Sequence, residues 1–288
     1  MAVSFILTAT LLVALLSSLV LGFFLRWRIT EESMPAKESE MGAQASIINL
    51  IYFIALIIIV TVAIVLLVKY GKLNVIRVFM VIVVALLIFS FTQFMMALYQ
   101  LYIVVVLYFS GHRWVAHWIP YILPVSIVFV VLFMAIYMLS VMKIRYINAR
   151  NFVLWINTIW AAVWFGWNSG YLTPILLLVG MAVYDLYSVF RGPLRELAEL
   201  MTTDTEEEEA EDTGVIIGLG DIFFYSFLVA YSHAILKPYQ LLVVMVVLFL
   251  GVLITFVLLF RYEVRALPAL PIPVLLSVGF IILFMYLP

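Results

Sequence analysis

Two aspartates lie inside hydrophobic stretches that carry no other acid. Asp185 occurs in VGMAVYDLYSVF and Asp221 in VIIGLGDIFFYSFL, whereas Asp204, Asp212 and every glutamate fall in short polar connections. An ionisable group at membrane depth costs about 2.5–3.5 kcal/mol on insertion scales, so its presence there indicates a function. Two carboxyl groups at one depth can share a proton, because both cannot ionise cheaply in a low dielectric. The ionised one can draw a proton from water while the protonated one polarises an amide carbonyl, as in an aspartic protease.

Three other interpretations of this pair remain open. Each aspartate could be a protonated, hydrogen-bonded packing residue, or the two could form the proton relay of a membrane transporter. A relay of this kind predicts an internal repeat between the halves of the fold, and the sequence contains no such repeat. The third alternative is a membrane chaperone or receptor that has the same fold without catalysis.

The composition is that of an integral membrane protein. Hydrophobic residues make up 67% of the 288 and charged residues 11%, whereas a soluble domain has about 45–50% and about 25%. The chain has no cysteine, which excludes disulfides, thiol catalysis and thiolate metal sites. Its three histidines are scattered, and its net charge of −1 gives no attraction to nucleic acid. We expect no metal, no organic cofactor and no nucleic-acid partner.

Nine hydrophobic runs are long enough to cross a bilayer, which takes about 20 residues each. They lie near 3–25, 45–68, 74–110, 117–142, 151–168, 171–190, 214–236, 239–260 and 266–287. The first is longer than a signal-peptide core and lacks a basic flank, so we interpret it as a retained helix. The third contains no glycine, proline or charge over residues 78–109, which predicts one long, tilted helix. The fold class is therefore all-α, a polytopic membrane protein with nine transmembrane helices.

The distribution of basic residues predicts how these helices are oriented, because cytoplasmic loops are richer in Lys and Arg. With the N-terminus inside, the cytoplasmic loops hold ten of them: Lys69, Lys72, Arg77, Lys143, Arg145, Arg150, Arg191, Arg195, Arg261 and Arg265. The opposite side holds five: Arg26, Arg28, Lys37, Arg113 and Lys237. We therefore expect a cytoplasmic N-terminus and a C-terminus on the opposite side.

This topology places both aspartates near the cytoplasmic face. Asp185 lies six residues before Arg191, where the sixth helix is expected to end, at a depth of ~9 Å. The seventh helix is expected to start near Gly214, seven residues before Asp221, at a depth of ~10 Å. Antiparallel neighbours would then present the two carboxyl groups at one level.

Two further motifs adjoin the pair. Gly218-Leu219-Gly220 directly precedes Asp221, and glycine permits close backbone approach and non-helical geometry, although small residues also serve helix packing in membranes. A phosphate-binding loop is not indicated, because no Lys-Ser/Thr pair follows. Leu267-Pro268-Ala269-Leu270-Pro271-Ile272-Pro273 opens the ninth helix on the same side. Its prolines disfavour a regular helix, so this segment is either an ordinary proline-rich helix start or loosened backbone that lines a site.

The order and type of these motifs resemble the signature of presenilins and signal peptide peptidases, which are intramembrane aspartyl proteases. The matching motifs are Tyr184-Asp185, Gly218-Leu219-Gly220-Asp221 and Pro268-Ala269-Leu270, on the sixth, seventh and ninth expected helices. The resemblance covers roughly residues 184–270, and the Leu-Pro-Ala-Leu-Pro form is closer to presenilins. It implies that Asp185 and Asp221 are catalytic. It also implies that Tyr184, Gly218, Leu219, Gly220, Pro268, Ala269 and Leu270 support the active site or position the substrate.

The resemblance also implies a division of the membrane domain and a set of partners. Residues 1–168 would form a scaffold of five helices, and residues 169–288 a catalytic part with a short acidic loop at 191–213. The expected partners are transmembrane-helix substrates and the lipid bilayer. The long N-terminal extension and the long loop between helices six and seven of animal presenilins are missing. A compact, stand-alone homologue without gamma-secretase-type subunits is therefore expected, in the cell membrane if its source is prokaryotic. The sequence leaves homo-oligomerisation open.

Overall fold

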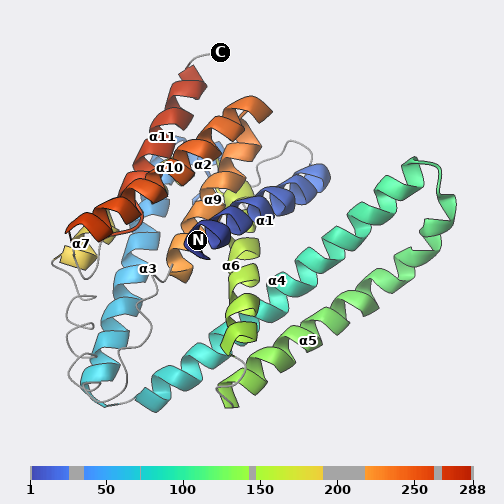
Figure 1. The fold of residues 1–288 in the computed structure, drawn as a ribbon, viewed down its shortest axis with the longest axis horizontal. Coiled ribbons are helices and arrows are strands. Elements are labelled where there is room, and N and C mark those ends of the chain that lie inside the picture. The colour runs from blue at the N-terminus through green and yellow to red at the C-terminus, as the bar shows by residue number, and fades with distance from the viewer. Residues whose placement is uncertain are drawn as a thin grey trace.

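The computed structural model describes residues 2–25, 36–71, 73–142, 147–190, 218–262 and 268–286, and these are helical with no strand among them (Figure 1). Nine long α-helices occur in this part of the chain: α1 (Ala2–Leu25), α3 (Ala43–Lys69), α4 (Leu73–Phe109), α5 (Ile122–Met142), α6 (Ile147–Trp167), α7 (Thr173–Phe190), α9 (Leu219–Ile235), α10 (Pro238–Tyr262) and α11 (Pro271–Tyr286). A short helix α2 (Glu38–Met41) precedes α3, and a 3₁₀ helix η1 (Arg113–Tyr121) precedes α5.

The expected all-α polytopic membrane fold is confirmed. Five stretches among the described residues are long and apolar enough to cross a membrane: Ile6–Phe23, Ala43–Leu67, Val81–Phe109, Arg113–Leu139 and Pro238–Leu259. Helices α7, α9 and α11 are shorter apolar helices. The long third run is one unbroken helix of 37 residues, α4, as its lack of glycine and proline predicted. The orientation in the membrane stays a prediction.

The helices differ in how much apolar surface they expose. None of the spanning window of α3 is buried inside the protein, and only 17% of that of α4 is. Figure 1 shows α4 and α5 as an antiparallel pair that leads away from the other helices. A helix that is apolar all round is stable where lipid surrounds it. These helices therefore present hydrocarbon-facing surface, whereas the packed interior lies elsewhere.

Interhelical hydrogen bonds hold part of this arrangement together. Thr92 of α4 donates its hydroxyl proton to Asn157 Oδ1 of α6 at 3.0 Å. The neighbouring residue of α4, Gln93, donates to Ser126 Oγ of α5 at 2.9 Å. Lipid tails are as apolar as leucine, so helix association in membranes depends on packing and on such bonds. The outer pair of helices is thereby tied to α6.

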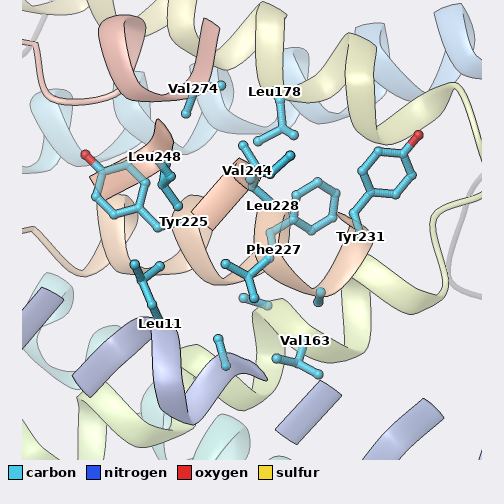
Figure 2. Close-up of a cluster of buried hydrophobic side chains, with 14 of the residues drawn as sticks. Leu11, Val163, Leu178, Tyr225, Phe227, Leu228, Tyr231, Val244, Leu248 and Val274 are labelled. Atoms are coloured by element: carbon cyan, nitrogen blue, oxygen red, sulfur yellow. The ribbon is translucent and has the colours of Figure 1, made fainter. Parts of the chain in front are cut away.

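Helix α9 lies at the centre of the largest buried cluster. Its residues Phe227, Leu228, Val229, Ala230 and Tyr231 are fully buried. They pack against side chains of α1, α6, α7, α10 and α11, some of which Figure 2 shows around the helix. The body of α9 is therefore held in place by neighbours on several sides, which matters because Asp221 lies in the first turn of the same helix.

Helices α10 and α11 approach each other most closely at a glycine. A Cβ atom added to Gly251 of α10 would lie 2.5 Å from the Cα of Pro273 in α11. Only the absence of a side chain permits this separation. Pro273 is the third residue of α11, so the contact sets the position of the start of this helix.

Replacing Gly251 with alanine should separate α10 from α11 and lower the stability by about 1–3 kcal/mol, the usual cost of overpacking. The matched control is Gly279→Ala on α11, where an added Cβ meets no described atom within 4 Å. Thermal unfolding in detergent should show a lower midpoint for Gly251→Ala alone. Equal midpoints for the two variants would contradict the close contact.

A carboxylate from the segment before α3 fixes the start of α7. Glu38 accepts backbone N–H bonds from Tyr171 at 2.9 Å, from Leu172 at 3.0 Å and from Thr173 at 2.5 Å. Its Oε1 also accepts the hydroxyl proton of Ser46 at 2.7 Å. The first N–H groups of a helix have no partner within the helix, and the helix dipole favours an anion there. Glu38 therefore stabilises the N-terminal end of the helix that carries Asp185.

Partial burial raises the pKa of Glu38, but the hydrogen bonds from Leu172, Thr173 and Ser46 outweigh it and place the pKa below its ordinary value of 4.5. A carboxyl group with a lowered folded-state pKa contributes stability above its unfolded pKa, and loses it as the pH falls through the folded one. The Glu38 contribution should therefore be complete near neutral pH, should begin to decrease as the pH falls below about 4.5, and should be lost as the pH falls through the lower pKa of the folded state.

Glu38→Gln should destabilise the protein by about 1–2 kcal/mol at pH 7, because hydrogen bonds to a charged acceptor are replaced by neutral ones. The difference from wild type should shrink as the pH falls below the ordinary glutamate value. Glu40→Gln is the matched control, since Glu40 forms only an exposed ion pair with Lys37 at 3.8 Å. Unfolding midpoints measured across this pH range test both statements, and a difference that does not change with pH would contradict the charge-based explanation.

Candidate active site

Asp185 lies near the C-terminal end of α7. It is five residues before Phe190, the last residue of this helix, and its side chain is half-buried. Its Oδ2 atom accepts a hydrogen bond from the backbone N–H of Leu270 at 3.1 Å. A residue near the end of α7 is thus bonded to the segment that precedes α11, the last helix, 85 residues later in the chain.

Asp221 lies in the first turn of α9, which begins at Leu219. Gly218 is the N-cap residue with an extended backbone (φ −67°, ψ 148°). Its N–H donates to Asp221 Oδ2 at 3.2 Å. This is the backward half of a capping box, in which the third helical residue bonds the N-cap backbone.

The expected start of this helix near Gly214 is therefore wrong. Gly214 lies outside the described residues, but the extended backbone of Gly218 excludes a helix that is continuous from there to Asp221. Asp221 consequently lies two residues, not seven, from the first residue of the helix. The physical reason is that a carboxylate in the first turn caps the free N–H groups and complements the helix dipole.

The segment 268–270 is non-helical, and α11 begins after it at Pro271. The expected helix start at 266 was thus too early. Proline is well tolerated at the first position of a helix but has no N–H to continue one backward. The backbone groups of this segment bond to other helices instead, since Leu270 donates to Asp185 as described above. Of the two interpretations of the proline-rich stretch, loosened backbone beside the aspartates describes the structure better.

Tyr225 is a residue of this site that the sequence reasoning missed. It is buried with 2% of its surface exposed, and its hydroxyl donates to the carbonyl of Ala269 at 2.9 Å. Four residues separate it from Asp221, so the two lie on one face of α9. That spacing was a usable signal, because a buried tyrosine hydroxyl nearly always needs a partner.

The two aspartates and the segment 268–270 come together in the structure. Helices α7, α9 and α11 all contact one another. The carboxyl groups of Asp185 and Asp221 are close enough to interact electrostatically. Asp185 holds Leu270 and Tyr225 holds Ala269. One acid of the pair, Asp185, therefore bonds directly to this stretch of irregular backbone, and the helix that carries the other acid bonds to it through Tyr225.

The other predicted site residues make no side-chain hydrogen bond to either aspartate in the described part of the chain, and they differ in how deeply they are buried. Tyr184 is half-buried and packs against the main hydrophobic cluster. Leu219 and Gly220 are exposed, and a Cβ added to Gly220 would meet no described atom within 4 Å. A Cβ added to Gly218 would lie 3.2 Å from Asp221 Oδ2. Of the two glycines in this motif, Gly218 is therefore the one where a side chain would crowd the Asp221 carboxylate.

Two comparisons with known proteins show what the C-terminal part of the chain is similar to. The presenilin family model matches residues 201–287, a range that contains Asp221, Tyr225 and the segment 268–270 but not Asp185. Presenilin-B from Dictyostelium discoideum is 35% identical over 125 residues, which are 40% of this chain and 25% of that protein. The matched part thus spans a quarter of the relative's length. Through its C-terminal part, this integral membrane protein is similar to the presenilin family.

Proposed function

We propose that this protein is an intramembrane aspartyl endopeptidase in which Asp185 and Asp221 form the catalytic pair. The observation that carries the proposal is that the Asp185 carboxyl bonds to the non-helical segment 268–270 and lies close enough to the Asp221 carboxyl to interact with it electrostatically. Similarity to the presenilin family supports this activity at the level of the family. We assign residues 169–288 as the catalytic part and residues 1–168 as its scaffold.

The reaction needs one acid in each protonation state. The ionised aspartate removes a proton from a water molecule, whose oxygen attacks the carbonyl carbon of the substrate peptide bond. The protonated aspartate donates its proton to the carbonyl oxygen, which gives a tetrahedral diol. The C–N bond then breaks as one hydroxyl loses a proton and the leaving nitrogen gains one. No covalent bond to the enzyme forms.

Backbone N–H groups fix the orientation of both acids. Leu270 donates to Asp185 Oδ2 and Gly218 donates to Asp221 Oδ2. Positioned catalytic groups avoid the reorganisation that would otherwise add to the barrier. In this proposal the Gly218 and Leu270 amides therefore act by holding the carboxyl groups, and they do not touch the reacting atoms.

The substrate would be a transmembrane helix of another protein. Its backbone amides are hydrogen-bonded and screened by side chains, so cleavage requires that a short stretch first unwinds into an extended form. Irregular backbone beside the aspartates offers a place where an extended stretch can pair. We propose that the chain does this without gamma-secretase-type subunits and in the membrane of the cell.

Asp185→Asn and Asp221→Asn should each lower the cleavage rate of a helical reporter in liposomes by at least about 100-fold, the loss expected for a general acid or base. Asparagine retains an oxygen that accepts the backbone N–H bond, so both variants should still unfold cooperatively. Glu40→Gln, which changes an exposed acid elsewhere, is the control and should cut at the wild-type rate. Gel analysis and mass spectrometry of the products measure the effect.

Two outcomes would overturn the proposal. One is a single Asn variant that cuts the reporter at the wild-type rate. The other is an intact reporter combined with proton flux into liposomes that depends on both aspartates, which would favour the transporter interpretation.

A further inference from the structure

Two tyrosines of α9, six residues apart, make the same kind of bond to different parts of the chain. Tyr225 and Tyr231 are both buried, with 2% and 0% of their surfaces exposed. The Tyr225 hydroxyl donates to the carbonyl of Ala269 at 2.9 Å, and the Tyr231 hydroxyl donates to that of Tyr171 at 2.5 Å. Figure 2 shows the two rings apart along the helix, with their hydroxyl groups pointing away from each other. Each ties α9 to a non-helical connection.

The surroundings of the two hydroxyls differ. Tyr225 is close enough to Asp221 and Asp185 to interact electrostatically with both carboxyl groups. Tyr231 instead lies near Glu38 and Tyr171, at the end of α9 away from Asp221. Only Tyr225 therefore adjoins the proposed catalytic pair.

The bond from Tyr225 completes the support of the segment 268–270. The N–H of Leu270 goes to Asp185 on α7, and the carbonyl of Leu270 accepts the N–H of Val274 on α11 at 3.0 Å. The Tyr225 bond to Ala269 adds a link to α9, the helix that carries Asp221. Each of the three helices thus holds this short piece of backbone through one bond.

We propose that Tyr225 is a positioning residue of the protease, a statement that rests on the function proposed above. Its hydroxyl sets the place of the Ala269 carbonyl relative to Asp221. The segment 268–270 in turn determines which peptide bond of an unwound substrate reaches the two acids. Tyr225 does not act on the reacting atoms. It controls the rate of the chemical step and the choice of the bond, because small displacements of a reacting group are costly in rate.

The test compares Tyr225→Phe with Tyr231→Phe, which remove the same group from equally buried sites on one helix. Both variants should lower the thermal midpoint by a similar amount, since each removes one hydrogen bond made by a buried tyrosine. Tyr225→Phe should also lower kcat by about 10–100-fold with KM changed by less than about 3-fold. Mass spectrometry should show its cleavage spread over neighbouring peptide bonds. Tyr231→Phe should retain the wild-type kcat and cleavage position.

A donor restored at the same place should rescue the reaction. Replacing Tyr225 with 4-aminophenylalanine keeps the ring and supplies an N–H toward Ala269, so kcat and the single cleavage position should largely return. If Tyr225→Phe fails to unfold cooperatively, the 4-aminophenylalanine variant is compared with wild type instead. A rescue variant that stays as slow as Tyr225→Phe would overturn the assignment.

The remaining outcomes separate this inference from the proposed function. If wild type cuts the reporter, the Asn variants do not, and the two Phe variants behave alike, then only the role of Tyr225 is overturned. If wild type cuts no helical reporter at all, the protease function falls and the role of Tyr225 falls with it.

Discussion

The constraint on which this structure depends is that hydrocarbon offers no hydrogen-bond partners to the backbone. A break in a helix at membrane depth persists only where other groups satisfy its N–H and C=O groups. The segment 268–270 is non-helical, and its partners are Asp185, Tyr225 and the first turn of α11. The polar groups of the candidate site are therefore also the groups that make its irregular backbone stable, so structure and chemistry depend on the same bonds.

The bonds at this site hold only if the helices that carry them are themselves fixed. Helix α7 is held at its first residues by Glu38, and α11 is held near its first residues by the close contact of Pro273 with Gly251. Helix α9 is surrounded by apolar side chains from Ile222 onward. Each fixing contact is at a distance from the aspartates, yet each determines where one of the three converging helices lies. Residues far from Asp185 and Asp221 thereby set the separation of the two acids.

Much of the fold could be predicted from the sequence, because apolar runs and the absence of helix breakers are local signals. The unbroken α4 is an example. The proximity of Asp185 and the proline-rich segment was predicted from their positions near the same-side ends of their hydrophobic runs. The start of α9 was predicted wrongly, since an apolar run does not reveal that Asp221 caps the helix from its first turn. The roles of Glu38 and Tyr225 were missed because their partners are 133 and 44 residues away or more. Hydrogen bonds between distant segments leave no periodic trace in a sequence.

The interpretation of the two aspartates as packing residues has to be weighed against these bonds, because each carboxyl group does accept a backbone N–H. An asparagine would accept the same bond through its amide oxygen and would carry no charge into the membrane. A pure packing role therefore gives no reason for two acids, and still less for two that lie close enough to interact. Like charges in a low dielectric disfavour double ionisation and leave the pair sharing one proton. Such a pair is unfavourable as a structural element and well suited to moving a proton between a water molecule and an amide, which is why we infer chemistry where packing alone would have selected asparagine.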